Sequence, residues 1–257
     1  MADGGALRVF VERDGALLRL RLSRPKANLI DAAMIAALHA ALLEHRARRG
    51  LRAVLIDAEG PHFSFGASVE EHLAERCAAM LASLHALLIE MLEFPVPILA
   101  AVRGQCLGGG LELALAATTI FAATDAQFGQ PEIKLGVFAP AASCLMPYRL
   151  GHAAAEDLLF SGRSIAAAEA KAIGLVDELA DDPGAAALSY FDAHLAARSS
   201  AALALAIAAV RGPRNAEVRK RLGELERLYV DTLMRTRDAN EGIAAFLERR
   251  QPQWEHC

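Results

Sequence analysis

Residues 98–117 join a short apolar strand signal, three consecutive glycines and an apolar helix signal. The first part, ILAAV at 98–102, carries no polar residue and predicts a strand buried in a core. Gly108, Gly109 and Gly110 follow, directly before LELALAA. Glycine adopts backbone conformations that other residues avoid, and it lets a chain approach a ligand closely. A buried strand that leads into a helix favours an α/β fold.

Strand and helix signals alternate as far as about residue 140, and helical signals dominate after it. Leu18, Leu20 and Leu22 recur at period two after an RDG turn, which predicts a hairpin. Apolar residues from Val69 to Met91 recur every three or four positions, which predicts one long helix. The other expected strands lie at 9–12, 53–57, 118–124 and 125–129, and a further helix at 31–49.

The C-terminal quarter of the chain has two different helical patterns. Residues 199–210 are apolar on almost every side, which predicts burial. Charges of both signs are interspersed from Arg211 to Arg250, as on a solvated or intersubunit helical face. A chain of 257 residues favours one core plus an appendage. We therefore expect an α/β core at 1–195 and a helical oligomerisation region at 196–257.

Composition and spacing argue against several classes of function. The net charge of −4 argues against a nucleic-acid partner. The four cysteines form no C-x-x-C pair and no H-E-x-x-H motif is present, so we expect no metal. The N-terminal segment lacks the features of a secretory signal, and no apolar run approaches the roughly 18 residues of a membrane span. We expect a cytoplasmic protein with no membrane partner.

The glycine triplet matches none of the common glycine motifs. The chain lacks the dinucleotide pattern G-x-G-x-x-G here, a Gly-Lys-Ser/Thr phosphate loop, and the nucleophile motif G-x-S-x-G. What remains is backbone chemistry. The first N–H groups of a helix have no partner within the helix, and the helix dipole favours negative charge beside them.

Two glutamates near the triplet are candidates for acid–base chemistry. Glu112 lies one turn into the apolar helix, where an unbonded carboxylate is costly to bury. Glu132 follows a proline turn in FGQPEIKLG. A helix and a returning strand can bring two such carboxylates to one water, as general base and general acid. The sequence leaves open that Glu112 only complements the helix dipole and that the two acids are unrelated.

A third segment, PHFSFGASVEEHL, places Gly66 before the predicted long helix. Its backbone N–H groups are available to a ligand on one interpretation. On the other, Ser68 caps the helix and Glu71 completes a capping box. Both interpretations can hold together.

In this order the segments resemble the crotonase (enoyl-CoA hydratase/isomerase) superfamily over most of the chain. RPKANLID resembles its early coenzyme A segment, HFSFGAS its H/A-F-S/C-x-G-A-D loop, and AQFGQPEIKLGV its second catalytic block. The glycine-rich block, SGRSIAAAEAKAIGLVDE and ANEGIAAFLERRQP resemble three further family segments. Each match is weak alone, and six in register are specific.

The resemblance implies a spiral of strand–strand–helix repeats with a C-terminal helical region, assembled as a homotrimer or as a hexamer of two trimers. It implies an acyl-CoA substrate and no separate cofactor, because coenzyme A is part of the substrate. It assigns acid–base catalysis to Glu112 and Glu132. The backbone N–H groups of Phe65 and Gly109 would hold the thioester oxygen. The residues expected at coenzyme A are Lys26, Ala27, Phe65 and Ala67.

Four residues depart from the family pattern around the acyl group. Ser68 replaces the usual Asp, Phe65 replaces a small residue, and Phe138 and Pro140 replace part of a glycine-rich loop. We expect Ser68, Phe138 and Pro140 to shape the acyl pocket. FSFGASVEEHL with LGVFAPAAS is similar to the branch that hydrates cyclohexa-1,5-diene-1-carbonyl-CoA. The alternatives are a straight-chain enoyl-CoA hydratase, another crotonase-type isomerase, decarboxylase or hydrolase, and a non-catalytic binding member of the fold.

Overall fold

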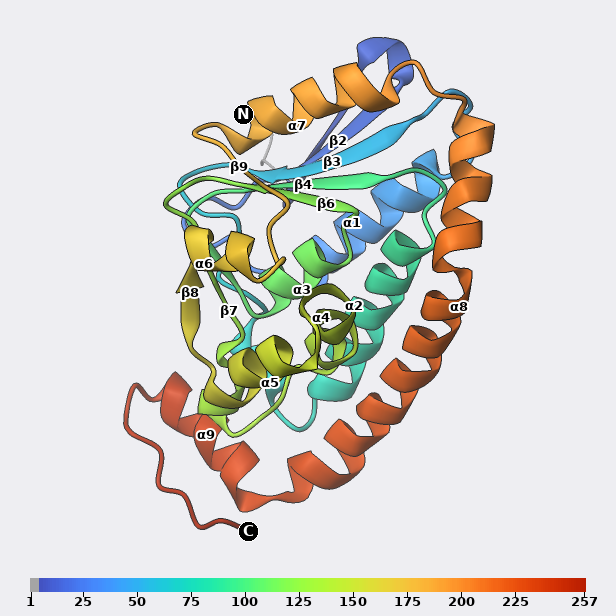
Figure 1. Ribbon diagram of the computed structural model, residues 1–257. Coiled ribbons are helices and arrows are strands. Elements are labelled where there is room, and N and C mark those ends of the chain that lie inside the picture. The colour runs from blue at the N-terminus through green and yellow to red at the C-terminus, as the bar shows by residue number, and fades with distance from the viewer. Residues whose placement is uncertain (1–4) are drawn as a thin grey trace.

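The computed structural model describes residues 5–257 and contains two sheets flanked by helices (Figure 1). The larger sheet has the order β1-β2-β3-β4-β6-β9, in which β1 and β2 are antiparallel and the other neighbours are parallel. Its strands are β1 Leu7–Glu12, β2 Leu17–Leu22, β3 Ala53–Ala58, β4 Ile98–Val102, β6 Thr119–Ala122 and β9 Glu178–Leu179. The smaller sheet contains β5 Gln105–Leu107, β7 Gln127–Gly129 and β8 Ser164–Ala166.

Nine α-helices lie in the described residues, and the last two form the C-terminal region. They are α1 Ala32–His45, α2 Cys77–Leu92, α3 Gly109–Leu115, α4 Pro140–Leu150, α5 His152–Ser161, α6 Ala167–Ala172, α7 Pro183–Tyr190, α8 Ser200–Arg227 and α9 Arg237–Leu247. The chain therefore has the predicted α/β core with a helical C-terminal region. Residues 1–4, part of the segment that argued against a secretory signal, lie outside the described residues.

Alternation along the strands divides the core between the two faces of the larger sheet. Leu17 and Leu55 pack against α7 on one face, and Leu18 and Ile56 join the larger core on the other. Successive strand residues point to opposite faces, so this division follows from the apolar pattern. Figure 1 shows α7 on one side of the sheet and α1 and α2 on the opposite side.

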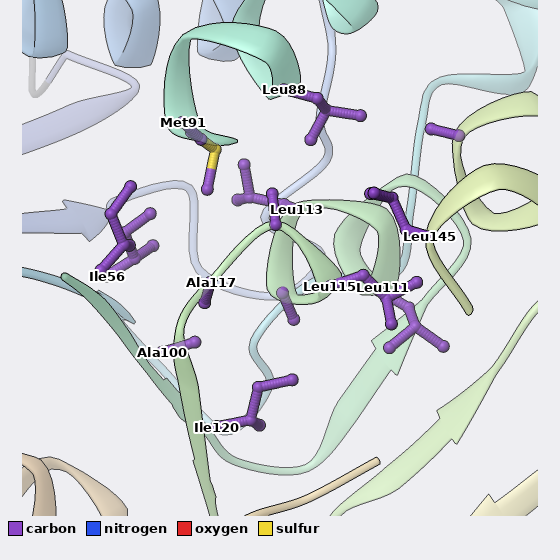
Figure 2. Close-up of a cluster of buried hydrophobic side chains, with 14 of the residues drawn as sticks. Ile56, Leu88, Met91, Ala100, Leu111, Leu113, Leu115, Ala117, Ile120 and Leu145 are labelled. Carbon is purple, nitrogen blue, oxygen red and sulfur yellow. The ribbon is translucent and has the colours of Figure 1, made fainter. Parts of the chain in front are cut away.

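Helix α3 is buried on every side, which fixes the position of its single acid. Leu111, Leu113 and Leu115 are each at most 6% exposed. Figure 2 shows them grouped with side chains from the sheet, from α2 and from α4. Because α3 has no solvated face, the carboxylate of Glu112 must lie inside the protein as well.

Two sequence predictions about helices are wrong. The long helix expected from Val69 begins at Cys77, because Val69–His72 forms a separate 3-10 turn that ends in the extended Leu73. Ser68 precedes that turn but makes no side-chain cap, and the Glu71 carboxylate accepts from the Ala32 amide instead.

The second wrong prediction is the burial of residues 199–210. Most of this stretch is exposed in the single chain, with Leu205 at 74% and Val210 at 80%.

Within residues 5–257 no single helix has the length and apolar character to cross a membrane. One bent pair, Pro183–Leu195 with Ser200–Arg235, passes by length and composition only.

Candidate active site

Glu112 is held in the first turn of α3, directly after the glycine triplet. Gly108 precedes the helix at φ 49° and ψ −128°, a conformation that favours glycine. The Glu112 side chain is buried, and its Oε1 accepts a hydrogen bond of 2.9 Å from the Ala142 amide at the start of α4. The carboxylate is thereby oriented by backbone from a different helix.

Glu132 approaches the same place from the end of β7. It lies in the 3-10 helix Pro131–Leu135, where the proline at the first position suits the helix start. A Cβ atom added to Gly108 would lie 2.7 Å from Glu132 Oε1, so a larger residue would displace this carboxylate. Its Oε2 is buried and has no hydrogen-bond partner among residues 5–257.

Burial makes both carboxylates hold protons more tightly than exposed glutamates do. Burial, followed by the charge of Glu112, raises the pKa of Glu132 to about 8. Burial also raises the pKa of Glu112, and the hydrogen bond from Ala142 opposes that rise. Two close acids in an apolar site disfavour double ionisation. At neutral pH the pair can therefore supply one acid and one base.

Two backbone amides lie beside the pair, at Ala67 and Gly109. A Cβ atom added to Gly109 would lie 3.2 Å from the Ala67 nitrogen, and one added to Gly66 would lie 3.5 Å from the Gly109 nitrogen. Among residues 5–257 neither amide donates a hydrogen bond. Gly109 is the first residue of α3, where free N–H groups and the helix dipole favour negative charge.

The prediction that the Phe65 amide supplies the second donor is wrong. This N–H donates a 2.9 Å hydrogen bond to the Ala27 carbonyl, and it is therefore not available to a substrate. The free amide lies two residues further on, at Ala67, which the family resemblance assigns to coenzyme A alone. No local pattern reveals this, because Ala27 comes from a distant segment of the chain.

A cleft and an inner pocket meet at these groups. The cleft has a volume of about 780 Å³ and is lined mainly by apolar residues, among them Leu29, Phe65, Val69, Leu107, Leu135, Phe246 and Leu247. The inner pocket, of about 10 Å³, is lined by Glu112, Gly109, Ala139, Tyr229 and others. Ala67, His72 and Glu132 line both. A buried water needs roughly 10–15 Å³, so the inner pocket is about the size of one water.

The predicted acyl-pocket and coenzyme A residues lie in different places. Ser68 and Phe65 line the cleft, whereas Phe138 and Pro140 line the inner pocket. Lys26 lies on an exposed turn with φ 102° and is not part of the cleft wall. Next to it, Ala27 contributes the carbonyl that holds Phe65. The contribution of Lys26 and Ala27 to binding stays a prediction.

Sequence reasoning missed His72, which lies at the junction, and Tyr229, which lines the inner pocket. Burial lowers the pKa of His72, whose Nδ1 lies 2.9 Å from the Ser68 carbonyl. Tyr229 belongs to the C-terminal region, and its ring meets Phe138 edge-on at a centroid distance of 5.4 Å. Because Tyr229 is far from both glutamates in the sequence, no local pattern indicated that it belongs to the site. Among residues 5–257, no three His, Cys, Asp or Glu side chains are grouped to hold a metal ion.

The sequence profile described as enoyl-CoA hydratase/isomerase matches residues 12–257. The chain is 61% identical over 250 residues to the cyclohexa-1,5-dienecarbonyl-CoA hydratase of Thauera aromatica, with 97% of each chain covered. It is 35% identical to a probable enoyl-CoA hydratase of Bacillus subtilis, with 91% of this chain and 93% of the relative covered.

The fold agrees with these relationships. A crystal structure of an enoyl-CoA hydratase/isomerase from Pseudoalteromonas atlantica superposes with a TM-score of 0.85 at 28% identity, covering 97% of this chain and 99% of that one. The predicted crotonase-like architecture is therefore confirmed. The chain belongs to the enoyl-CoA hydratase/isomerase family.

Proposed function

We propose that this protein is an acyl-CoA hydratase, a carbon–oxygen lyase that adds water to a conjugated double bond of an enoyl thioester. The observation that carries the proposal is the meeting of Glu112, Glu132 and the free amides of Ala67 and Gly109 at one small buried pocket. A thioester carbonyl held by the two amides has its β-carbon within reach of an acid, a base and one water. A non-catalytic member of the fold has no need of two costly buried carboxylates.

In the proposed reaction the Ala67 and Gly109 amides donate to the thioester oxygen. One glutamate removes a proton from the water while its oxygen bonds to the β-carbon. The electron pair of the double bond moves onto the thioester oxygen, where the amides stabilise the negative charge. As the enolate collapses, the other glutamate delivers a proton to carbon. Loss of one amide donor of this kind costs roughly 3–4 kcal/mol in the transition state.

The proposed substrate is cyclohexa-1,5-diene-1-carbonyl-CoA, which would yield a 6-hydroxycyclohexene thioester. Support comes from the 61% identity with the hydratase of Thauera aromatica, whose name gives that substrate. The bulky Phe65 in the cleft and Phe138 in the inner pocket suit a compact ring. The same chemistry on a straight enoyl chain is the alternative, and a probable enoyl-CoA hydratase is 35% identical.

Several finer expectations belong to the same proposal. The reaction consumes only water and the thioester, so it requires no separate cofactor. Lys26 and the backbone near Ala27 are proposed to contact the nucleotide part of coenzyme A, and Ser68 the pantetheine or acyl part. The assembly is proposed to be a trimer or a pair of trimers in the cytoplasm, with residues 196–257 forming the contacts.

A thioester panel tests the proposal. The cyclic dienoyl-CoA and crotonyl-CoA are supplied separately in heavy-oxygen water, and incorporation of oxygen into the acyl group and release of free coenzyme A are measured. We expect one oxygen in the ring, no released coenzyme A, and faster turnover of the cyclic substrate. Faster turnover of crotonyl-CoA would remove the cyclic assignment, and release of coenzyme A would indicate a hydrolase.

The glutamate pair is tested in the same assay. Glu112→Gln and Glu132→Gln keep the side-chain size and remove the acid–base function, so each is expected to lower turnover by about 10²-fold or more. The control is Glu44→Gln on the exposed side of α1. Near-normal turnover in both active-site variants would overturn the assignment.

A further inference from the structure

The Tyr229 hydroxyl is a buried polar group that the proposed reaction has not yet used. Tyr229 is 1% exposed, and its hydroxyl has no hydrogen-bond partner among residues 5–257. A buried hydroxyl without a partner is unfavourable, so one that is retained requires an explanation. Its position supplies one, because Tyr229 lines the inner pocket together with Glu112 and Glu132.

A second unpartnered atom belongs to the same pocket. Glu132 Oε2 is also buried and without a partner, and Glu132 lines this pocket together with Tyr229. One atom is an acceptor and the other is a hydroxyl that can donate, so a single oxygen-bearing group between them would satisfy both. The pocket, at about 10 Å³, has room for little more than one water or one substrate hydroxyl.

The surroundings keep Tyr229 in its donating form. Burial, followed by the nearby Cys77, Glu132 and Glu112, raises the pKa of the Tyr229 phenol. The phenol therefore remains protonated at neutral pH. The edge-on contact with Phe138 restrains the ring, so the hydroxyl is held in place without a fixed partner in the protein.

We propose that Tyr229 is a third catalytic side chain: its hydroxyl donates a hydrogen bond to the water that attacks the thioester and, after addition, to the new hydroxyl of the product. This inference rests on the proposed hydratase function and adds to it a group specific for the transferred oxygen. The Tyr229 proton stays on the phenol. The proton lost by water goes to a glutamate, as in the reaction above.

The test compares Tyr229→Phe with the wild type and with Tyr148→Phe. Tyr148 is half exposed and bonds to Glu217 on the surface, which makes it a matched control. We expect Tyr229→Phe to lower kcat by about tenfold or more, the effect of one lost transition-state hydrogen bond, with little change in KM. Tyr148→Phe should match the wild type.

Thermal unfolding separates this role from a structural one. Because the hydroxyl has no protein partner, Tyr229→Phe is expected to unfold at a temperature no lower than the wild type. A lower unfolding temperature together with lower kcat would indicate that the hydroxyl supports the fold, and it would overturn the proposal.

Ligand binding provides a readout that needs no turnover. In a Glu112→Gln background, which slows the reaction enough for binding to be measured, Tyr229→Phe should weaken binding of the 6-hydroxycyclohexene thioester by about tenfold. Binding of the cyclohexene thioester without the hydroxyl should be unchanged. Equal effects on both ligands would overturn the proposal. A kcat of Tyr229→Phe within about twofold of the wild-type kcat would overturn it as well. A wild type that hydrates neither thioester would instead overturn the hydratase function and this inference with it.

Discussion

Glu132 holds a proton at a pH at which an exposed glutamate is ionised. Its pKa in the fold is raised to about 8 by burial and by Glu112, against about 4.3 in an unfolded chain. Between these values the folded state binds more protons than the unfolded state. The stability that this proton contributes is complete below the unfolded pKa and is lost as pH rises through about 8.

Glu132→Gln removes that titration and keeps the size of the side chain. We compare the unfolding free energy of the variant with that of the wild type at each pH. The difference should favour the variant by at least about 1 kcal/mol more at about pH 8.5 than at about pH 5. Urea unfolding at both pH values measures this. Glu44→Gln, on the surface, should show no such change. An equal difference at both pH values for Glu132→Gln would contradict the raised pKa.

A substitution at Gly109 tests the proposed role of the amide pair. An alanine methyl here would lie 3.2 Å from the Ala67 nitrogen, in the space that the thioester oxygen needs. We expect Gly109→Ala to lower kcat by about 10²–10³-fold while the protein stays folded, because Gly109 already has a helical backbone. Steady-state kinetics and circular dichroism measure the two effects.

Gly223→Ala is the matched control for Gly109→Ala. This glycine lies inside α8 with open space around it, so alanine should leave kcat unchanged and stabilise the helix by about 0.5–1 kcal/mol. Normal turnover in Gly109→Ala would show that its amide does not face the reacting oxygen.

At this scale the sequence located the acids better than the amides. Glu112 and Glu132 are placed by features visible in the chain, a glycine triplet before a helix and a proline turn after a strand. The amide pair depends on which N–H groups the fold has already used. Phe65 is excluded only by its bond to Ala27, a contact between segments that local pattern cannot reveal.

At the scale of elements, the buried strands were predictable and the start of α2 was not. The apolar runs at 53–57 and 98–102 became β3 and β4 because short apolar runs require burial on both faces. The helical spacing from Val69 continued into α2, but Val69–His72 instead forms a turn in the wall of the cleft. Residues that line a site can repeat at helical intervals without being in the helix.

Helix α8 is attached to the core by polar contacts with Leu92 at the end of α2 and with Thr118 directly before β6. The Leu92 carbonyl belongs to the last turn of α2, where no further helical N–H is available. Asn215 Nδ2 of α8 donates to it at 2.9 Å, and the buried Arg211 of α8 donates to Thr118 Oγ1 at 2.6 Å. Side chains of one helix thus complete the hydrogen bonding of another element.

Asn215→Ala would leave the Leu92 carbonyl with only the longer of its two side-chain hydrogen bonds, the 3.4 Å bond from Arg211 Nη1. We expect the free energy of unfolding to fall by about 1–3 kcal/mol, as measured by urea unfolding. Lys220→Ala, on the exposed side of the same helix, should change it by less than about 0.5 kcal/mol. If the two variants were equally stable, the contact with Leu92 would contribute nothing to the attachment of α8.

For the whole molecule, the first half of α8 is the feature that a single chain leaves unexplained. Leu205 and Val210 are largely exposed, although the apolar composition of 199–210 predicted burial. An apolar composition predicts that a surface is buried, but it does not indicate whether the same chain or another copy covers that surface. Figure 1 shows α8 running along the outside of the core, where a second copy has access to it.

The proposed assembly gives that surface a partner and predicts a measurable mass. We expect light scattering to show three or six times the chain mass of 27.4 kDa. Leu205→Glu combined with Val210→Glu places two charges on the apolar surface, where burial against another copy would be costly, so the mass should fall. Arg49→Glu, on an exposed turn after α1, changes the net charge equally and should leave the mass unchanged. A full-sized assembly in the double variant would mean that other residues form the contacts, because two buried and unpaired carboxylates are incompatible with a packed apolar interface.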